Sequence, residues 1–197
     1  MNIEEVTFDN FMDLDSKDRK RILNDPDLLK QLVRKNVTPH RYEHSLSVAE
    51  VCKKLAEKHN VDVNKAYMAG LLHDVCKFPD SDSSGVLEEY LRFYDPDKLN
   101  GVYGVYHAWV AKYYLREKCN FHDSDILNAI YNHTICRSRD KLSLILYIAD
   151  KREPLRKIDD DILKIAYVDL YKAFEKLERD VKKYIEGKNE KFVGNSL

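Results

Sequence analysis

The segment AYMAGLLHDVC, residues 66–76, constrains the fold of this chain more than any other. It is apolar on nearly every face of a helix, apart from His73 and Asp74 near its end. A helix that is apolar all round is buried on all sides, so these two polar residues must be buried with it. Burying a carboxylate is costly unless the charge is paired or bound by a cation. The chain is therefore expected to build a helical core around a polar centre.

The rest of the chain also favours helices. Among 197 residues there are only 6 Gly and 5 Pro, and apolar residues recur at helical spacing. Thr38 and Pro39 form a typical N-cap and first-turn pair, and the polar stretch FPDSDSSG, 78–85, is typical of a loop. We predict an all-α fold with helices at about 39–59, 63–77, 102–118, 124–134, 141–151 and 159–186.

Further polar residues lie on apolar faces of the predicted helices. His44, for example, continues a stripe through Val48, Val51 and Leu55 at the i, i+4, i+7, i+11 spacing. The inward-facing set is completed by His107, His133 and Asp150. A single core imidazole can be satisfied by a backbone carbonyl. Four histidines and two aspartates on five helices are more simply explained by convergence on metal ions.

The order of these residues resembles a known signature. His44, the adjacent pair His73-Asp74 and then Asp150 match the H…HD…D pattern of the HD-domain metal-dependent phosphohydrolase superfamily. The segments RYEHSLSVAE, KAYMAGLLHDVCKFP, NHT and LYIADKREP are similar to the YqeK group of this superfamily, the symmetrical bis(5'-nucleosyl)-tetraphosphatases. The resemblance implies an HD-domain bundle of about six core helices, hydrolysis of diadenosine tetraphosphate to two ADP, and a dinuclear centre that includes His107 and His133.

The resemblance also suggests how the chain is divided. We expect a short helical N-terminal extension at 1–37, charged and only weakly amphipathic, an HD domain at 38–187 and a frayed tail at 188–197. Two features depart from the family pattern: the segment HTICRSRDKLS after His133 is lengthened and lacks glycine, and Ala108 replaces the glycine that usually follows His107. Both fall where backbone would approach phosphate closely, so they bear on the substrate.

The expected mechanism uses two metal ions about 3.5 to 4 Å apart, bridged by Asp74 and by a hydroxide that attacks phosphorus. We expect His44, His73 and Asp150 to hold one ion, and His107 and His133 the other. The cofactors would be two divalent or mixed-valence ions; mixed nitrogen and oxygen ligation suits iron, with manganese and similar ions as alternatives.

Four residues are predicted to contact the nucleotide substrate. Lys77 follows Asp74 by three residues and, on a continuing helix, would reach the same face and hold a phosphate oxygen. Its alternative role is that of a cation at a helix C-terminus. Arg41, Thr134 and Arg137 match family positions that could contact phosphate, although either arginine could instead be solvated.

Charge and hydropathy argue against a nucleic-acid-binding protein and against a membrane protein. With 33 Lys plus Arg against 34 Asp plus Glu, the net charge of −1 gives no basic surface for nucleic acid or for an anionic membrane. No apolar run is long enough to span a bilayer and the N-terminus is acidic, so we expect a cytoplasmic protein, with a homodimer left open. Two alternatives remain: a phosphohydrolase for a mono-, tri- or cyclic nucleotide, and a non-catalytic metal-bound nucleotide sensor.

Overall fold

The computed structural model describes residues 3–8, 10–77 and 107–194, without side chains beyond residue 183. Within these ranges the fold is all-α, as predicted, and holds no strand. Its α-helices are α1 Ser16–Asn24, α2 Pro26–Asn36, α3 Pro39–His59, α4 Val63–Leu72, α6 His107–Tyr113, α7 Ser124–Asn132, α8 Lys141–Arg152, α9 Ile162–Ala166 and α10 Leu170–Gly194. Short turns of other helix types are η1 Ile3–Glu5, η2 Phe11–Asp13, η4 Tyr114–Lys118 and η5 Pro154–Arg156.

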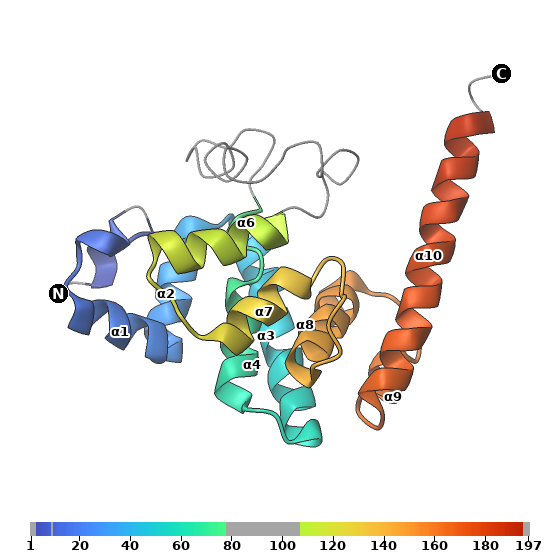
Figure 1. Cartoon of the computed structure of the whole chain (residues 1–197), viewed down its shortest axis with the longest axis horizontal. Helices are drawn as coiled ribbons and strands as arrows, with labels where there is room; N and C mark the ends of the chain where they lie inside the picture. The colour runs from blue at the N-terminus through green and yellow to red at the C-terminus, as the bar shows by residue number, and fades with distance from the viewer. Residues whose placement is uncertain (1–2, 9, 78–106, 195–197) are drawn as a thin grey trace.

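Helices α3, α4, α7 and α8 pack against one another in the middle of the molecule (Figure 1). The bounds of α3 agree with the prediction because its ends are encoded locally. Thr38 caps its start by accepting a hydrogen bond from the Arg41 N–H, and Asn60 ends it in the left-handed conformation, with φ of 55°. Asp62 then caps α4 through two backbone N–H groups.

The contact between α3 and α4 is a backbone-to-backbone approach at Gly70. A Cβ atom built on Gly70 would lie 2.5 Å from Ala49 Cα and 2.8 Å from Ala49 N, closer than real Cβ atoms come to other heavy atoms. Only glycine therefore allows this crossing, which holds the first half of α3 beside the end of α4.

The N-terminal helices contribute more to the core than their sequence suggested. Phe11, Ile22, Leu29 and Leu32 are completely buried and belong to the same apolar cluster as α3, α4 and α8. The expectation of a weakly amphipathic extension was therefore wrong. The apolar positions are divided between two short helices by the cap at Asp25, so neither helix shows a long stripe.

Two of the predicted helices also differ from those in the structure. Helix α4 stops at Leu72 rather than 77, and Asp74 to Lys77 form tight turns instead. The single helix predicted at 159–186 is broken, because Asp169 accepts a hydrogen bond from the Lys172 N–H at 3.0 Å near the start of α10. Helix α10 then continues to Gly194, so the backbone of 188–194, where fraying was expected, is helical. The predicted loop 78–85 and residues 102–106 lie outside the described residues.

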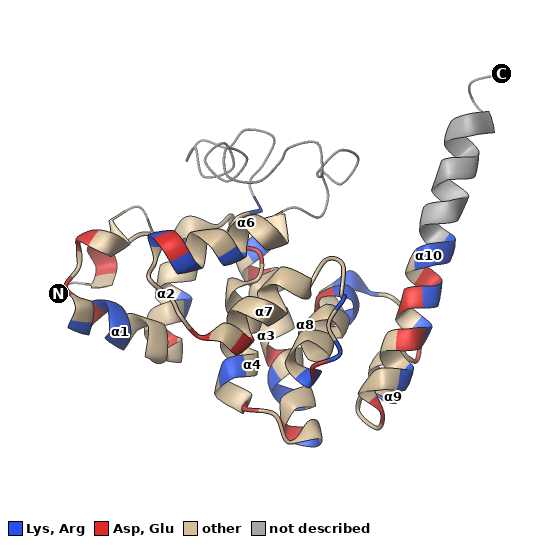
Figure 2. Ribbon diagram, in the orientation of Figure 1, with Lys and Arg blue, Asp and Glu red and all other residues tan. Residues whose placement is uncertain are grey.

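Basic and acidic residues are interspersed along the described helices (Figure 2). This agrees with the balanced composition. Among the described residues, no helix combines the length and the apolar character needed to cross a membrane.

Candidate metal centre

The structure brings together the inward-facing polar residues predicted from the sequence. All of them have 9% or less of their surface exposed: His44, His73, Asp74, His107, His133 and Asp150. They come from α3, α6 and α8 and from the residues that directly follow α4 and α7. Elements far apart in the chain therefore build one compact group of imidazoles and carboxylates.

Asp74 lies in the middle of this group. Its Oδ1 atom lies 3.2 Å from His107 Nε2, and 3.6 Å from Nε2 of both His73 and His133. Its Oδ2 atom faces the other way and lies 3.9 Å from His44 Nε2. One carboxylate can thus be shared between two sets of imidazoles.

Asp150 closes the opposite side of the group. Its Oδ1 atom lies 3.2 Å from His44 Nε2 and 3.7 Å from His73 Nε2. The remaining pair of rings is also close, with 3.0 Å between Nε2 of His107 and Nε2 of His133. All four histidines therefore present the same ring nitrogen to the interior.

The outer nitrogens of three of the rings also have partners. The Nδ1 atoms of His73 and His133 each lie 2.7 Å from a carbonyl oxygen three residues earlier, to which an Nδ1–H can donate. His44 Nδ1 instead lies 3.1 Å from Oε1 of Glu153. In the tautomer that these contacts favour, each Nε2 carries a lone pair directed inward.

The donor set fits metal ions. His73 Nε2 and Asp74 Oδ1 are buried without a hydrogen-bond partner, which is costly unless something else satisfies them. Ligand atoms within 4.8 Å of one another occur in two groups, His44 with His73 and Asp150, and His73 with Asp74 and His133. Mixed imidazole and carboxylate ligands suit iron, manganese and similar ions.

For both carboxylates and for His107 and His133, the electrostatics favour the deprotonated forms that metal ligands require. Burial acts to lower the pKa of His73, but the nearby carboxylates of Asp74 and Asp150 outweigh it and raise that pKa. Burial alone would raise the pKa of the Asp74 carboxyl, but His73 and the other imidazoles around it, together with Lys77, hold that pKa well below its usual range. Burial acts on the pKa of Asp150 in the same direction, and the neighbouring imidazoles of His44 and His73, together with Lys151, outweigh it and lower that pKa. Burial lowers the pKa of His133 to about 4, so this ring is neutral at pH 7.

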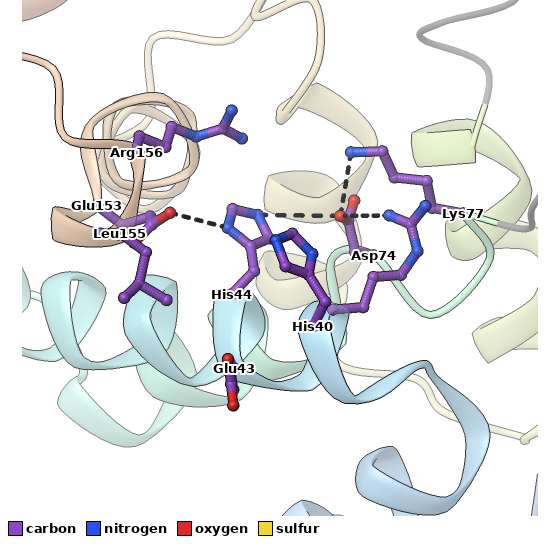
Figure 3. Close-up of a pocket in the computed structure, with 9 residues that line it drawn as sticks. His40, Glu43, His44, Asp74, Lys77, Glu153, Leu155 and Arg156 are labelled. Carbon is purple, nitrogen blue, oxygen red and sulfur yellow. Dashed lines mark hydrogen bonds and ion pairs between the residues drawn. The ribbon is translucent and has the colours of Figure 1, made fainter.

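A cavity of about 400 Å³ opens onto the group (Figure 3). Two residues predicted to contact substrate lie in its wall and bind Asp74 Oδ2: Lys77 through Nζ at 3.1 Å and Arg41 through Nη1 at 3.3 Å. Lys77 reaches Asp74 through a tight turn instead of the continuing helix that we expected. The cavity therefore offers cations directly beside the buried carboxylate.

Thr134 and Arg137 are placed differently. Thr134 is half-buried directly after His133, and Arg137 is exposed, with its backbone N–H donating to Asn132 Oδ1 at 3.1 Å. Neither is among the described residues that line the cavity. Their contact with substrate stays a prediction.

Five residues of the cavity wall were not assigned from the sequence: His40, Glu43, Glu153, Leu155 and Arg156. Arg156 donates from Nη2 to Asp150 Oδ1 at 2.8 Å and from Nε to the Asp150 carbonyl. The available signal was the charged run DKREPLR after the apolar part of α8, in which Pro154 begins the short turn η5.

Comparison with known proteins agrees with this geometry. The family model of the HD domain matches residues 41–155, more than half of the chain and all six buried ligand candidates. The chain belongs to the HD domain family. The resemblance drawn from its motifs is thereby confirmed, and as a member of the HD domain family the chain is a metal-dependent hydrolase.

Relatives of this HD domain protein carry one recurrent name. This chain is 36% identical over 143 residues to the symmetrical bis(5'-nucleosyl)-tetraphosphatase of Staphylococcus aureus. The match covers 70% of this chain and 72% of that protein. The protein of the same name from Halalkalibacterium halodurans is 34% identical over 134 residues, covering 64% of this chain and 68% of its own length. A solved HD superfamily hydrolase from Clostridium acetobutylicum, described as involved in NAD metabolism, superimposes with a TM-score of 0.72 at 31% identity, covering 84% and 89% of the two chains.

Proposed function

We propose that the chain hydrolyses diadenosine tetraphosphate symmetrically to two ADP, at a dinuclear metal centre held by the six buried residues. The observation that carries this proposal is the convergence of four imidazoles and two carboxylates beside a cavity. Two of these residues, His44 and Asp74, line that cavity together with Arg41 and Lys77. The names of the relatives support the choice of substrate.

In this proposal His44, His73 and Asp150 would hold one ion, His107 and His133 would hold the other, and Asp74 would serve both. Iron is the ion we propose first, with manganese as the alternative. The chemistry that the metal ions supply there is Lewis acidity, which makes a water nucleophilic near neutral pH and polarises a phosphoryl oxygen.

The residues of the chain then have distinct tasks. Asp74 stays ionised because its pKa is held low, so it can balance cationic charge in the interior. Arg41 and Lys77 approach Asp74 from the cavity side, where they are placed to hold phosphate oxygens and to stabilise the charge that builds up during the attack on phosphorus. The apolar helices around the group exclude bulk water and keep these interactions strong.

The direct test is metal analysis of the purified protein together with hydrolysis of diadenosine tetraphosphate. We expect about two metal ions per chain, ADP as the sole nucleotide product, and loss of turnover on chelation that is reversed when the metal is restored. ATP plus AMP as products would contradict symmetrical cleavage. A panel of AMP, ATP and cyclic AMP tests hydrolysis of another nucleotide, and tight binding without turnover would favour a sensor.

Replacement of Lys77 separates phosphate binding from metal binding. We expect Lys77→Gln to lower kcat/KM by about tenfold, the value of one charge-assisted contact partly screened by solvent. The affinity for Mn²⁺ should not fall, because the substitution removes a cation from the neighbourhood of Asp74. Steady-state kinetics and chelator competition measure the two quantities. Lys53→Gln, on the exposed face of α3, is the matched control, and an equal loss in both variants would remove the role assigned to Lys77.

A further inference from the structure

One buried carboxylate near the metal centre belongs to none of the roles above. Glu153 lies between α8 and η5, and only 2% of its surface is exposed. A buried glutamate requires hydrogen-bond partners to compensate for its lost hydration. The partners of Glu153 in this structure indicate its role.

Both carboxylate oxygens of Glu153 are engaged. Oε2 accepts hydrogen bonds from Ser47 Oγ and from the Leu155 N–H, each at 2.7 Å. Oε1 lies 3.1 Å from His44 Nδ1. Figure 3 shows His44 between Glu153 on one side and Asp74 on the other. The carboxylate is thus held by Ser47 and Leu155 while its second oxygen faces the outer nitrogen of the imidazole.

His44 differs in this respect from its neighbours. The Nδ1 atoms of His73 and His133 face backbone carbonyls of their own chain segments, three residues earlier. His44 has a charged acceptor that comes from 109 positions further along the chain. A carboxylate in this place fixes the tautomer and ring orientation of a metal-binding histidine and increases the basicity of the ring.

We propose that Glu153 is a positioning residue, which through its hydrogen bond to Nδ1 directs the Nε2 lone pair of His44 toward the metal centre. The inference rests on the proposed metal centre. Glu153 itself touches neither metal nor substrate; it sets how tightly His44 binds. Its contribution is therefore measured as metal affinity and not only as turnover.

The experiment compares Mn²⁺ affinity by chelator competition across a set of variants. We expect Glu153→Ala to weaken Mn²⁺ binding about 10- to 100-fold, as loss of such a partner does elsewhere. Glu153→Gln, whose amide oxygen can still accept from Nδ1–H, should weaken binding less. With Mn²⁺ at saturation, kcat should recover most of its original value in both variants.

Two controls distinguish positioning from general effects. Glu50→Gln removes the same charge from an exposed position of α3 that is not among the described residues lining the cavity, and should leave Mn²⁺ affinity unchanged. In a His44→Ala background, Glu153→Ala should have no further effect on affinity, because Glu153 acts through His44. Glu153 also caps η5, and loss of that cap alone would lower the Tm of the metal-free protein without changing affinity.

The outcomes separate this inference from the proposed centre. If His44→Ala lowers Mn²⁺ affinity but Glu153→Ala and Glu153→Gln do not, the positioning role is wrong and the metal centre stands. If His44→Ala itself leaves Mn²⁺ affinity and stoichiometry unchanged, the assignment of the centre fails. Additive losses in the double variant would show that Glu153 acts independently of His44, which also overturns the inference.

Discussion

Asp74→Asn is expected to lower kcat/KM for diadenosine tetraphosphate by at least about a thousandfold, since catalysis by a metal centre supplies several kcal/mol of transition-state stabilisation. Asp74 is the residue that four imidazoles and two cations share. Its Oδ1 atom faces three of the rings, and its Oδ2 atom faces His44, Arg41 and Lys77. The amide keeps the size of the side chain and removes its charge. Metal binding and the balance of charge around the phosphate should therefore be lost together.

The fold should survive this substitution, because the helices are held by a continuous apolar core. Far-ultraviolet circular dichroism and thermal unfolding of the metal-free variant test that point, and metal analysis tests the loss of ions. Asp159→Asn removes an identical charge from an exposed position and should keep parental kinetics. Parental turnover by a folded Asp74→Asn protein would contradict the proposed mechanism.

The candidate site could be predicted because its residues break an otherwise apolar pattern. His73 and Asp74 end a helix that is apolar all round, and His44 interrupts a stripe on α3, so burial followed from spacing alone. The expected burial of several histidines and aspartates then indicated that they share metal ions as a common partner. The bounds of α3 and the start of α4 were predictable for a different reason, because Thr38 and Asp62 cap these helices through contacts local in sequence.

The residues that were missed depend on contacts distant in sequence. Glu153 lies at a turn, on no apolar stripe, and its burial follows only from the arrival of α3 beside α8. Arg156 reaches Asp150 from the short turn η5, which follows directly after the end of α8. The break between α9 and α10 was missed since the segment has the periodicity of one long helix, and only the cap at Asp169 marks the interruption.

The second large expected effect is a loss of stability when the close spacing between α3 and α4 is disturbed. Gly70→Ala is expected to lower the free energy of unfolding of the metal-free protein by about 2 to 3 kcal/mol, since overpacking in a tight core outweighs the roughly 1 kcal/mol that alanine adds to helix propensity. The new methyl group would meet Ala49 Cα at 2.5 Å. Ala49 Cα is a backbone atom and cannot rotate away as a side chain could, so α3 would have to move.

This movement would also reach the metal centre. Helix α3 carries His44 and α4 leads into His73, and the centroids of these two rings are 5.2 Å apart. Gly70→Ala should therefore weaken Mn²⁺ binding as well as stability, as measured by chelator competition and urea unfolding. Asn64→Ala, at an exposed position of α4, is the matched control and should change stability by less than about 0.5 kcal/mol.

A second substitution tests whether the backbone of Ala49, and not its methyl group, causes the expected loss of stability. Ala49→Gly removes the Ala49 methyl group but leaves Ala49 Cα and N in the path of the new Cβ, at 2.5 and 2.8 Å. The double variant should therefore be no more stable than Gly70→Ala alone. Recovery of stability would show that the two helices meet through side chains, and parental stability of Gly70→Ala would show that they are further apart. In either case the spacing that sets His44 against His73 would have to come from another part of the core.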